Sequence, residues 1–381
     1  MSEATFHKRW PLCRLFGIPV RIDVSWLFLA VLVTWSLAVG YFPVAYAGLS
    51  PRIYWSMGVV GALGLFASII LHEVSHALVA RRFDLQIDGI TLFVFGGVAE
   101  MADEPKTAKG EFLMAAAGPI ASAGLSIAFL LLTVLLEAQA WPVPLIGVIA
   151  YLAMINGVLA VFNLVPAFPM DGGRILRAFL WYRRGDLVDA TRVASRAGDG
   201  LGLIMIGLGV FSVLSGQVIG GIWWALIGLF VRQAARQSYQ QVQMRRLFAG
   251  HSVRLYMTEP VVSVPWETRI GSFIQDTLLH QHHDLYPVVR DGRLAGYILT
   301  RDVMALPIET RDISAIDRIV HPLSDEMTIA PDAAVLDALA KMRRGGNSRL
   351  LVVADDRLVG IVTLKDLLDF FSLKVGLGEL K

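Results

Sequence analysis

Two histidines and a glutamate stand together in one apolar segment, Leu71-His72-Glu73-Val74-Ser75-His76. Histidines four residues apart lie on the same face of a helix, so both imidazoles can reach one metal ion. Glu73 lies beside them and can accept a proton from a water molecule bound to that ion. Zinc lowers the pKa of such a water to about 7, which makes hydroxide available at neutral pH. The spacing therefore predicts a catalytic zinc site.

A packing role is the alternative, because a single buried histidine is more often a core residue than a ligand. Here three ionisable groups, His72, Glu73 and His76, share one otherwise apolar segment. Ionisable groups inside a membrane are costly unless they are paired, and they usually mark a functional site. This cost favours the metal site over packing.

A catalytic zinc ion usually has three protein ligands. The carboxylate that fits best is Asp171, in the segment Asn163-Leu-Val-Pro-Ala-Phe-Pro-Met-Asp171-Gly-Gly. Prolines and glycines there interrupt an apolar stretch at the end that also carries the histidines. A helix cap is the alternative role for Asp171. The competing third ligands, in a predicted hairpin and just after it, are Glu100 and, less favoured, Asp103 and Glu104.

Membrane-spanning helices must position these residues. The chain has 381 residues, of which 55% are apolar and 17% charged, with 35 glycines and one cysteine. This composition excludes a disordered chain, a disulfide scaffold and an ordinary soluble enzyme. Crossing a bilayer takes about 20 helical residues. Six stretches reach or approach that length, at residues 24–42, 54–80, 111–136, 145–165, 199–215 and 219–236.

Lysine and arginine are distributed unevenly among the connections. The ends that carry the histidines and Asp171 hold nearly all of them, whereas the opposite connections (43–53, 137–144 and 216–218) hold only Arg52. Basic residues concentrate on the cytoplasmic side of membrane proteins. We therefore predict a multi-pass protein of the cell membrane, with an even number of spans and both termini in the cytoplasm.

Short strands are expected beside the spans. Residues Val20–Val24 alternate with period two, and residues 85–101 are rich in β-branched and aromatic residues around glycines. The predicted fold class is a polytopic α-helical membrane protein with a small membrane-associated β hairpin or sheet. Non-helical backbone at this depth requires protein or water around it.

The C-terminal part of the chain contains a repeat. Asp291-Gly292-Arg293-Leu294-Ala295-Gly296 recurs 64 residues later as Asp355-Asp356-Arg357-Leu358-Val359-Gly360. Each copy reads as helix, strand, tight turn, strand and helix, which favours a cytoplasmic α+β module of two copies. The expected domains are residues 1–240, a linker at 237–250, and a tail at 251–381 with copies at about 251–310 and 311–375.

At this point a resemblance becomes specific. The His72-Glu73-x-x-His76 motif, the Asn163 to Gly172 motif and the Gly118-Pro119 pair resemble the site-2 protease family of intramembrane zinc metalloproteases. The resemblance implies that His72, His76 and Asp171 bind zinc, that Glu73 is the general base and that Asn163 contacts the substrate. Substrates would be transmembrane proteins within the lipid bilayer. Ser122 departs from the family, where many relatives have asparagine.

The tail resembles a pair of CBS domains. The stretch Gly360 to Asp366 matches the CBS pattern in which a hydroxyl and a carboxylate, here Thr363 and Asp366, contact an adenine nucleotide such as ATP or AMP. In the first copy Asp302 matches the carboxylate, but Leu299 occupies the place of the hydroxyl. CBS pairs also act as dimerisation or docking modules, so a homodimer is expected. Nucleic acid is not an expected partner.

Other readings stay open. The first is a transporter or channel regulated by CBS domains, in which the His, Glu and Asp cluster is an ion site. A catalytically inactive binder is the second. An aspartyl protease would pair Asp171 with Asp199, but no second motif supports it. His280, His282 and His283 favour a surface patch over a metal site, because no cysteine or well-spaced carboxylate joins them.

Overall fold

The structure is a computed structural model that describes residues 10–377, except residues 86, 94–95, 102–104 and 312. The chain divides into two units, residues 1–240 and 241–381. Helix α8 (Val218–Phe248) is continuous and includes most of the predicted linker. The predicted boundaries of the domains and of the two tail copies stay predictions.

Within the described residues, six helices are long and apolar enough to cross a membrane. This confirms the predicted fold class. The first span joins α1 (Val24–Ser36), a wider π-helical turn (Leu37–Tyr41) and α2 (Phe42–Ala45). The others are α3 (Pro51–Arg81), α4 (Ala108–Ala138), α5 (Val143–Asn163), α7 (Leu187–Leu214) and α8.

One predicted boundary was wrong and one helix extends beyond its predicted span, and local hydrogen bonds explain both. The strand predicted at Val20–Val24 is β2 (Ile18–Ile22), because the Asp23 side chain accepts a hydrogen bond from the Ser25 amide and starts α1 at Val24. Helix α7 begins at Leu187, before the span predicted near 199–215, since Asp186 caps that helix in the same way.

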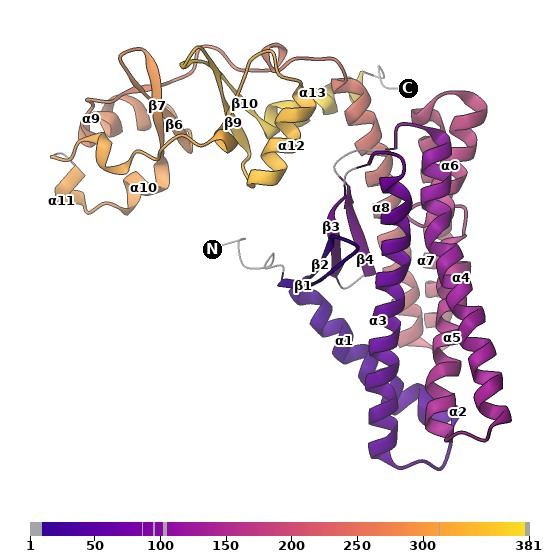
Figure 1. Ribbon diagram of the computed structural model, residues 1–381. Helices are drawn as coiled ribbons and strands as arrows, with labels where there is room; N and C mark the ends of the chain where they lie inside the picture. Colours follow the sequence, from indigo (N-terminus) through magenta and orange to yellow (C-terminus); the bar gives the residue numbers. More distant parts are fainter. Residues whose placement is uncertain (1–9, 86, 94–95, 102–104, 312, 378–381) are drawn as a thin grey trace. The chain divides into compact units, whose positions relative to one another are not determined.

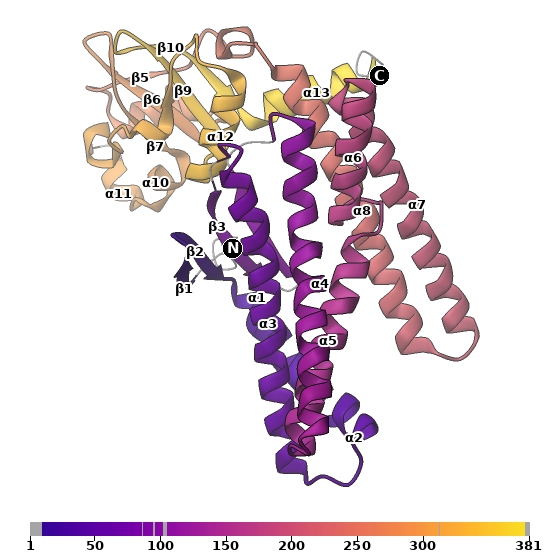
Figure 2. The ribbon, with the colours of Figure 1, turned by 45° about the vertical axis from the view of Figure 1, so that its right-hand side comes forward.

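Helices α3, α4 and α5 lie side by side (Figures 1 and 2). Glycine permits close approach to the first span, because a Cβ on Gly58 of α3 would lie 2.8 Å from the Thr34 carbonyl oxygen. Asn156 of α5 is fully buried and donates a hydrogen bond of 2.9 Å to the Ser68 hydroxyl of α3. These contacts fix the rotation of α3 one turn before its first histidine.

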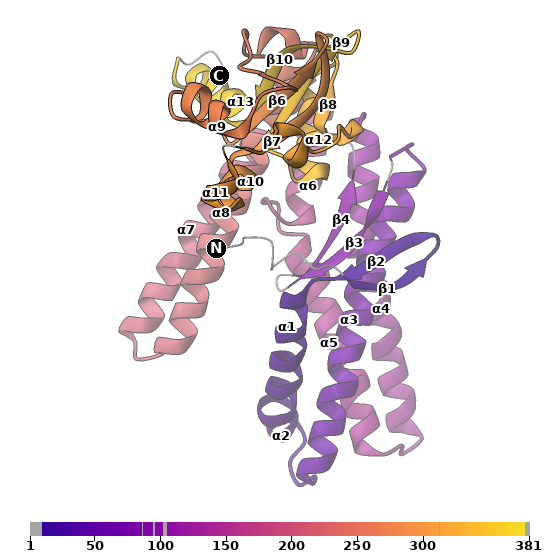
Figure 3. The same ribbon diagram turned by 90° about the vertical axis from the view of Figure 1, so that its left-hand side faces the viewer.

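A four-stranded sheet packs beside the C-terminal half of α3 (Figure 3). Its order is β1 (Trp10–Leu15), β2, β3 (Ile87–Phe93) and β4 (Gly96–Met101). Strands β2 and β3 are parallel, and the other pairs are antiparallel. The hairpin predicted at 85–101 is therefore present as β3 and β4. A small core of Ile18, Val74, Ala77 and Ile90 joins the sheet to the helix that carries the histidines.

The second unit contains two three-stranded sheets that repeat one pattern. Strands β6 (Leu285–Arg290) and β7 (Arg293–Leu299) recur 64 residues later as β9 (Arg349–Ala354) and β10 (Arg357–Thr363). Both connecting turns have positive φ at two successive residues, Asp291-Gly292 and Asp355-Asp356, as two-residue hairpins with right-handed strand twist require. The repeat read from the sequence is thus a structural repeat.

The remaining elements of this unit are short. Strands β5 (Val264–Pro265) and β8 (Thr328–Ile329) complete the two sheets by parallel pairing. The helices are α9 (Ile270–Phe273), α10 (Thr300–Ala305), α11 (Ile308–Arg311), α12 (Val335–Gly345) and α13 (Leu364–Gly376).

Candidate active site and metal centre

The two histidines of α3 point their Nε2 atoms at one place. His72 Nε2 and His76 Nε2 lie 3.2 Å apart, and each lies 3.1 Å from the same oxygen, Oδ2 of Asp171. All three residues are at most 9% exposed. The predicted trio therefore meets, although 95 residues separate Asp171 from the nearer histidine.

A folded-back connection delivers the carboxylate. After Asn163 ends α5, the chain turns and helix α6 (Asp171–Arg184) begins at Asp171 itself. Gly172 and Gly173 lie so close to the backbone of the turn that a Cβ on either would overlap with it. The glycines therefore let the first turn of α6 approach the connection, which places Asp171 beside α3.

The trio fits a zinc ion. Ligands of a tetrahedral zinc ion, each bound at about 2.0–2.1 Å, lie roughly 3.3 Å from one another. The observed separations of 3.1–3.2 Å agree with one triangular face of such a tetrahedron. Within the part of the chain that the structure describes, this is the one group of three such side chains that could hold a metal ion.

Hydrogen bonds at Nδ1 orient both imidazoles so that their Nε2 atoms can bind a metal ion. His76 Nδ1 donates to the Met114 carbonyl oxygen at 2.7 Å, and His72 Nδ1 lies 2.9 Å from the Ser122 hydroxyl. Protons on these Nδ1 atoms leave the Nε2 lone pairs for an ion. Asp171 Oδ2 faces both Nε2 atoms and so can complete the ligand set, for which the carboxyl group must be deprotonated.

Gly118 of α4 lies directly against the rings of His72 and His76. A Cβ added there would overlap with the Nε2 atoms of both His72 and His76, at the place where their ligand atoms converge. We expect the Gly118→Ala variant to lose zinc although every ligand is intact, with affinity reduced more than 100-fold. Loss of an outer hydrogen bond alone costs about 10–100-fold. Zinc titration of the purified protein measures this effect.

The matched control is Gly124→Ala, because Gly124 lies on the same helix and has nothing within 4 Å of the added methyl group. It should bind zinc like the wild type. Equal zinc affinity in the Gly118→Ala variant would contradict the proposed position of the ion.

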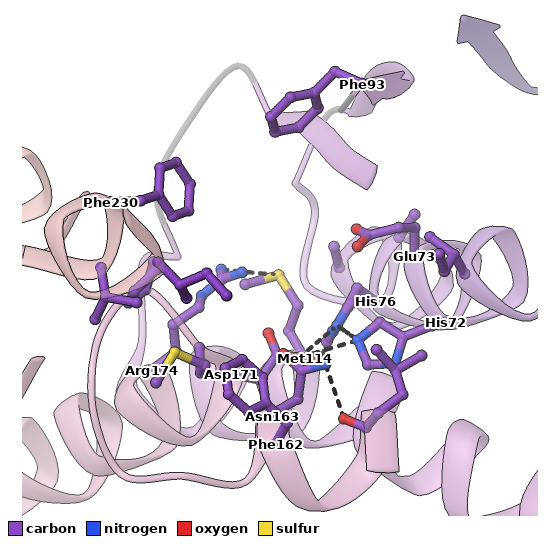
Figure 4. A pocket seen from close by; sticks show the side chains of 18 of the residues that line it. His72, Glu73, His76, Phe93, Met114, Phe162, Asn163, Asp171, Arg174 and Phe230 are labelled. Carbon is purple, nitrogen blue, oxygen red and sulfur yellow. Dashed lines mark hydrogen bonds and ion pairs between the residues drawn. The ribbon is translucent and has the colours of Figure 1, made fainter. Parts of the chain in front are cut away.

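A cavity of about 790 Å³ opens onto the trio (Figure 4). Its wall includes His72, His76 and Asp171, and elsewhere it is mostly aliphatic and aromatic. Glu73 also lines it, and among the described residues its carboxylate has no hydrogen-bond or ion-pair partner. The site thus combines a three-ligand centre with a free carboxylate in an apolar cavity.

Comparison with known proteins decides the family. The profile of peptidase family M50 matches residues 60–141 and 134–206, and that of the CBS domain matches residues 316–373. Rip3 of Mycobacterium tuberculosis is 38% identical over 370 residues, covering 95% of this chain and 93% of that protein. The chain belongs to peptidase family M50, the site-2 proteases. Zinc metalloprotease MJ0392 of Methanocaldococcus jannaschii is 31% identical over 97% of this chain and 98% of its own length.

A solved site-2 protease from the same archaeon shares 31% identity and aligns with a TM-score of 0.42 over 61% of this chain and 95% of its own. Membership of family M50 makes this protein a zinc metalloendopeptidase and a multi-pass membrane protein, with membrane proteins as the family's substrates. Family membership therefore favours the interpretation as an enzyme over the interpretation as a transporter.

The other predicted residues of this M50 site fall in different places. Asn163 lines the cavity, and its Nδ2 donates to the Leu159 carbonyl oxygen of its own helix at 3.0 Å. The side chain of Glu100, with Asp103 and Glu104, lies outside the described residues. Asp199 is held by Arg232 and Arg236 of α8, at 3.0 and 2.8 Å, so it is a partner in a salt bridge.

In the tail, the Thr363 hydroxyl accepts a hydrogen bond from the Asp366 amide at the start of α13. Asp302 pairs with His321 at 2.6 Å, and His321 stacks on Tyr297. A cavity of about 650 Å³ in this unit is lined by other residues, among them Glu259, Pro260, Ser263, Gly292 and Leu358.

Sequence reasoning missed three residues around the M50 centre. Arg174 lines the cavity, and its one clue was its spacing of three residues from Asp171 on the same helix face. Glu111 of α4 is fully buried and accepts from Arg177 of α6, with Nε at 2.6 Å. This buried pair fixes α6, and with it Asp171, against the helix that supplies the Met114 carbonyl.

Proposed function

We propose that His72, His76 and Asp171 hold one zinc ion, and that Glu73 acts as general base in the hydrolysis of peptide bonds in or near transmembrane segments. The single observation that carries the proposal is the convergence of three buried ligand atoms, 3.1–3.2 Å apart, beside an unpaired carboxylate in an apolar cavity. This arrangement supports the proposal of zinc-dependent hydrolysis, the chemistry of regulated intramembrane proteolysis.

Zinc in this position would supply a polarised water and an electrophile for the scissile carbonyl. Glu73 takes a proton from the attacking water and passes it to the leaving amine. The amide of Asn163 keeps one N–H beyond the bond to Leu159, and this donor contacts the substrate backbone. Aliphatic and aromatic walls exclude bulk water and accept an apolar segment.

The test is cleavage of a tagged single-span membrane protein by the full chain in proteoliposomes. We expect cleavage to stop with a zinc chelator and to return when zinc is added in excess of the chelator. Cleavage that a chelator leaves unchanged would rule out the zinc mechanism, and ion flux without cleavage would favour a transporter.

The proposed orientation puts both termini and the tail in the cytoplasm. Its support is the sequence, in which the connections at the ends of the spans that carry the site hold nearly all the lysine and arginine. In this orientation the active site lies near the cytoplasmic end of the bundle.

For the tail we propose regulation by an adenine nucleotide, ATP or AMP, with Thr363 and Asp366 as contacts. The Asp366 carboxylate has no ion-pair partner among the described residues, so it is available to a ribose. Asp302, the corresponding residue of the first copy, would have to exchange His321 for the nucleotide. Homodimerisation through the tail stays a prediction.

Calorimetry on the full chain in detergent tests this role. We expect ATP or AMP to bind, and Asp366→Ala to weaken binding by about 10–100-fold, the loss of a hydrogen bond to a charged group. Asp369→Ala, an exposed change on the same helix, should leave the affinity unchanged. Absence of heat with ATP, ADP and AMP would leave docking as the role of the tail.

A further inference from the structure

One cation stands in the apolar cavity, and the hydrolysis steps above do not use it. Arg174 lies in the first turn of α6, three residues after Asp171, and lines the cavity together with Glu73 (Figure 4). Guanidinium groups stay protonated in proteins, so this positive charge is permanent.

Arg174 makes only a weak hydrogen bond within the part of the chain that the structure describes. Among the described residues its polar contact is one N–H donated to the Met114 sulfur at 3.9 Å, and thioethers are weak acceptors. Arg177, on the next turn of α6, is instead matched by the Glu111 carboxylate. Arg174 is partly exposed and shares the cavity wall with Glu73 and Asp171, but no hydrogen bond or ion pair joins it to either carboxylate among the described residues. Its guanidinium donors are therefore available to an anion that is present during only part of the reaction cycle.

Hydrolysis creates such an anion in this cavity. The water oxygen bonds to the carbonyl carbon, the C–N bond breaks, and both water protons end on the nitrogen. One fragment becomes a carboxylate and the other an ammonium. A guanidinium fork matches a carboxylate with two parallel hydrogen bonds. We propose that Arg174 binds a peptide carboxylate in the cavity, namely the C-terminus formed by cleavage. This inference rests on the proposed function.

The probe is a dansylated Leu-Ala-Leu-Ala-Leu peptide, prepared as the free acid and as the C-terminal amide. Its binding is measured by fluorescence anisotropy on the full chain in detergent, both loaded with zinc and metal-free. The metal-free arm removes any contribution of zinc to carboxylate binding. Charged hydrogen bonds predict that the acid binds about 10–100-fold more tightly than the amide.

We expect Arg174→Met to bring this ratio close to one in metal-free protein, and Arg174→Lys to keep only part of it, because lysine lacks the fork. The control is Arg183→Met, an exposed change on the same helix that should keep the full ratio. Thermal melting of each variant shows whether the fold is intact.

A third peptide, an amide with one internal aspartate, distinguishes the source of the carboxylate. The wild type could bind that peptide more tightly than the free acid and lose this preference in Arg174→Met. This result would overturn the assignment to the cleavage product and would indicate that Arg174 recognises acidic side chains of substrates. An equal acid-to-amide ratio in wild type and Arg174→Met would overturn the whole inference. Chelator-sensitive cleavage can persist in either case, so failure here is distinct from failure of the proposed protease.

Discussion

Glu73→Gln should keep its zinc and lose nearly all cleavage. Glutamine preserves the size of the side chain but cannot accept the proton of the attacking water, and general base catalysis contributes roughly 10²–10⁴-fold to rates. Glu73 is not one of the three converging ligands, so we expect one zinc ion per chain as in the wild type. Metal analysis and cleavage in proteoliposomes, done on one preparation, measure both quantities.

The control for this variant is Glu137→Gln, an exposed glutamate at the far end of α4. It should cleave at the wild-type rate. Undiminished cleavage by Glu73→Gln would remove Glu73 from the mechanism, whereas loss of zinc in this variant would make it a ligand.

Asp171→Asn should lose both zinc and cleavage. The amide keeps the shape of the side chain but removes the charge that the two imidazoles face at 3.1 Å. We expect zinc affinity to fall by more than the 10–100-fold typical of losing an outer-shell partner, because a ligand itself is altered. Zinc titration measures the affinity, and proteoliposome cleavage with excess zinc shows whether activity follows occupancy.

Asp199→Asn is the matched control and also tests the aspartyl protease alternative. Asp199 pairs with Arg232 and Arg236, so its replacement should leave zinc and catalysis in place. An aspartyl mechanism predicts the reverse, namely that both aspartate variants are inactive and that chelators have no effect.

The sequence predicted the ligand trio because each part of it has a local pattern. Spacing of four residues sets His72 and His76 on one helix face, and the prolines and glycines around Asp171 mark where the chain leaves a span. The repeat in the tail was likewise visible, since strands β6 and β7 and their acidic turn return at a fixed offset of 64 residues.

Contacts between spans were not predictable in the same way. The overlap at Gly118, the bond from His76 to the Met114 carbonyl and the bond between His72 and Ser122 all depend on how α3 and α4 pack. Nothing in the periodicity of one apolar segment sets its rotation against another. Ser122, read only as a departure from the family, in fact contacts a proposed ligand.

Polar groups at the ends of spans were the other gap. Arg177 is one of several basic residues near the ends of spans, and its partner Glu111 lies 66 residues away and is fully buried. The sequence does not show which acidic residue pairs with a given arginine. Hydropathy likewise did not show where α7 starts, because the Asp186 cap extends the helix through polar turns that lie outside the apolar stretch.

Zinc X-ray absorption spectroscopy on the purified full chain tests the central claim most directly. The account predicts one zinc ion per chain, surrounded only by nitrogen and oxygen at about 2.0–2.1 Å, with the scattering pattern of two imidazoles. In Asp171→Asn this signal should be lost or rearranged. A sulfur ligand, which in this chain would implicate Cys13 or a methionine, or a zinc signal that survives replacement of His72, His76 and Asp171 together, would contradict it.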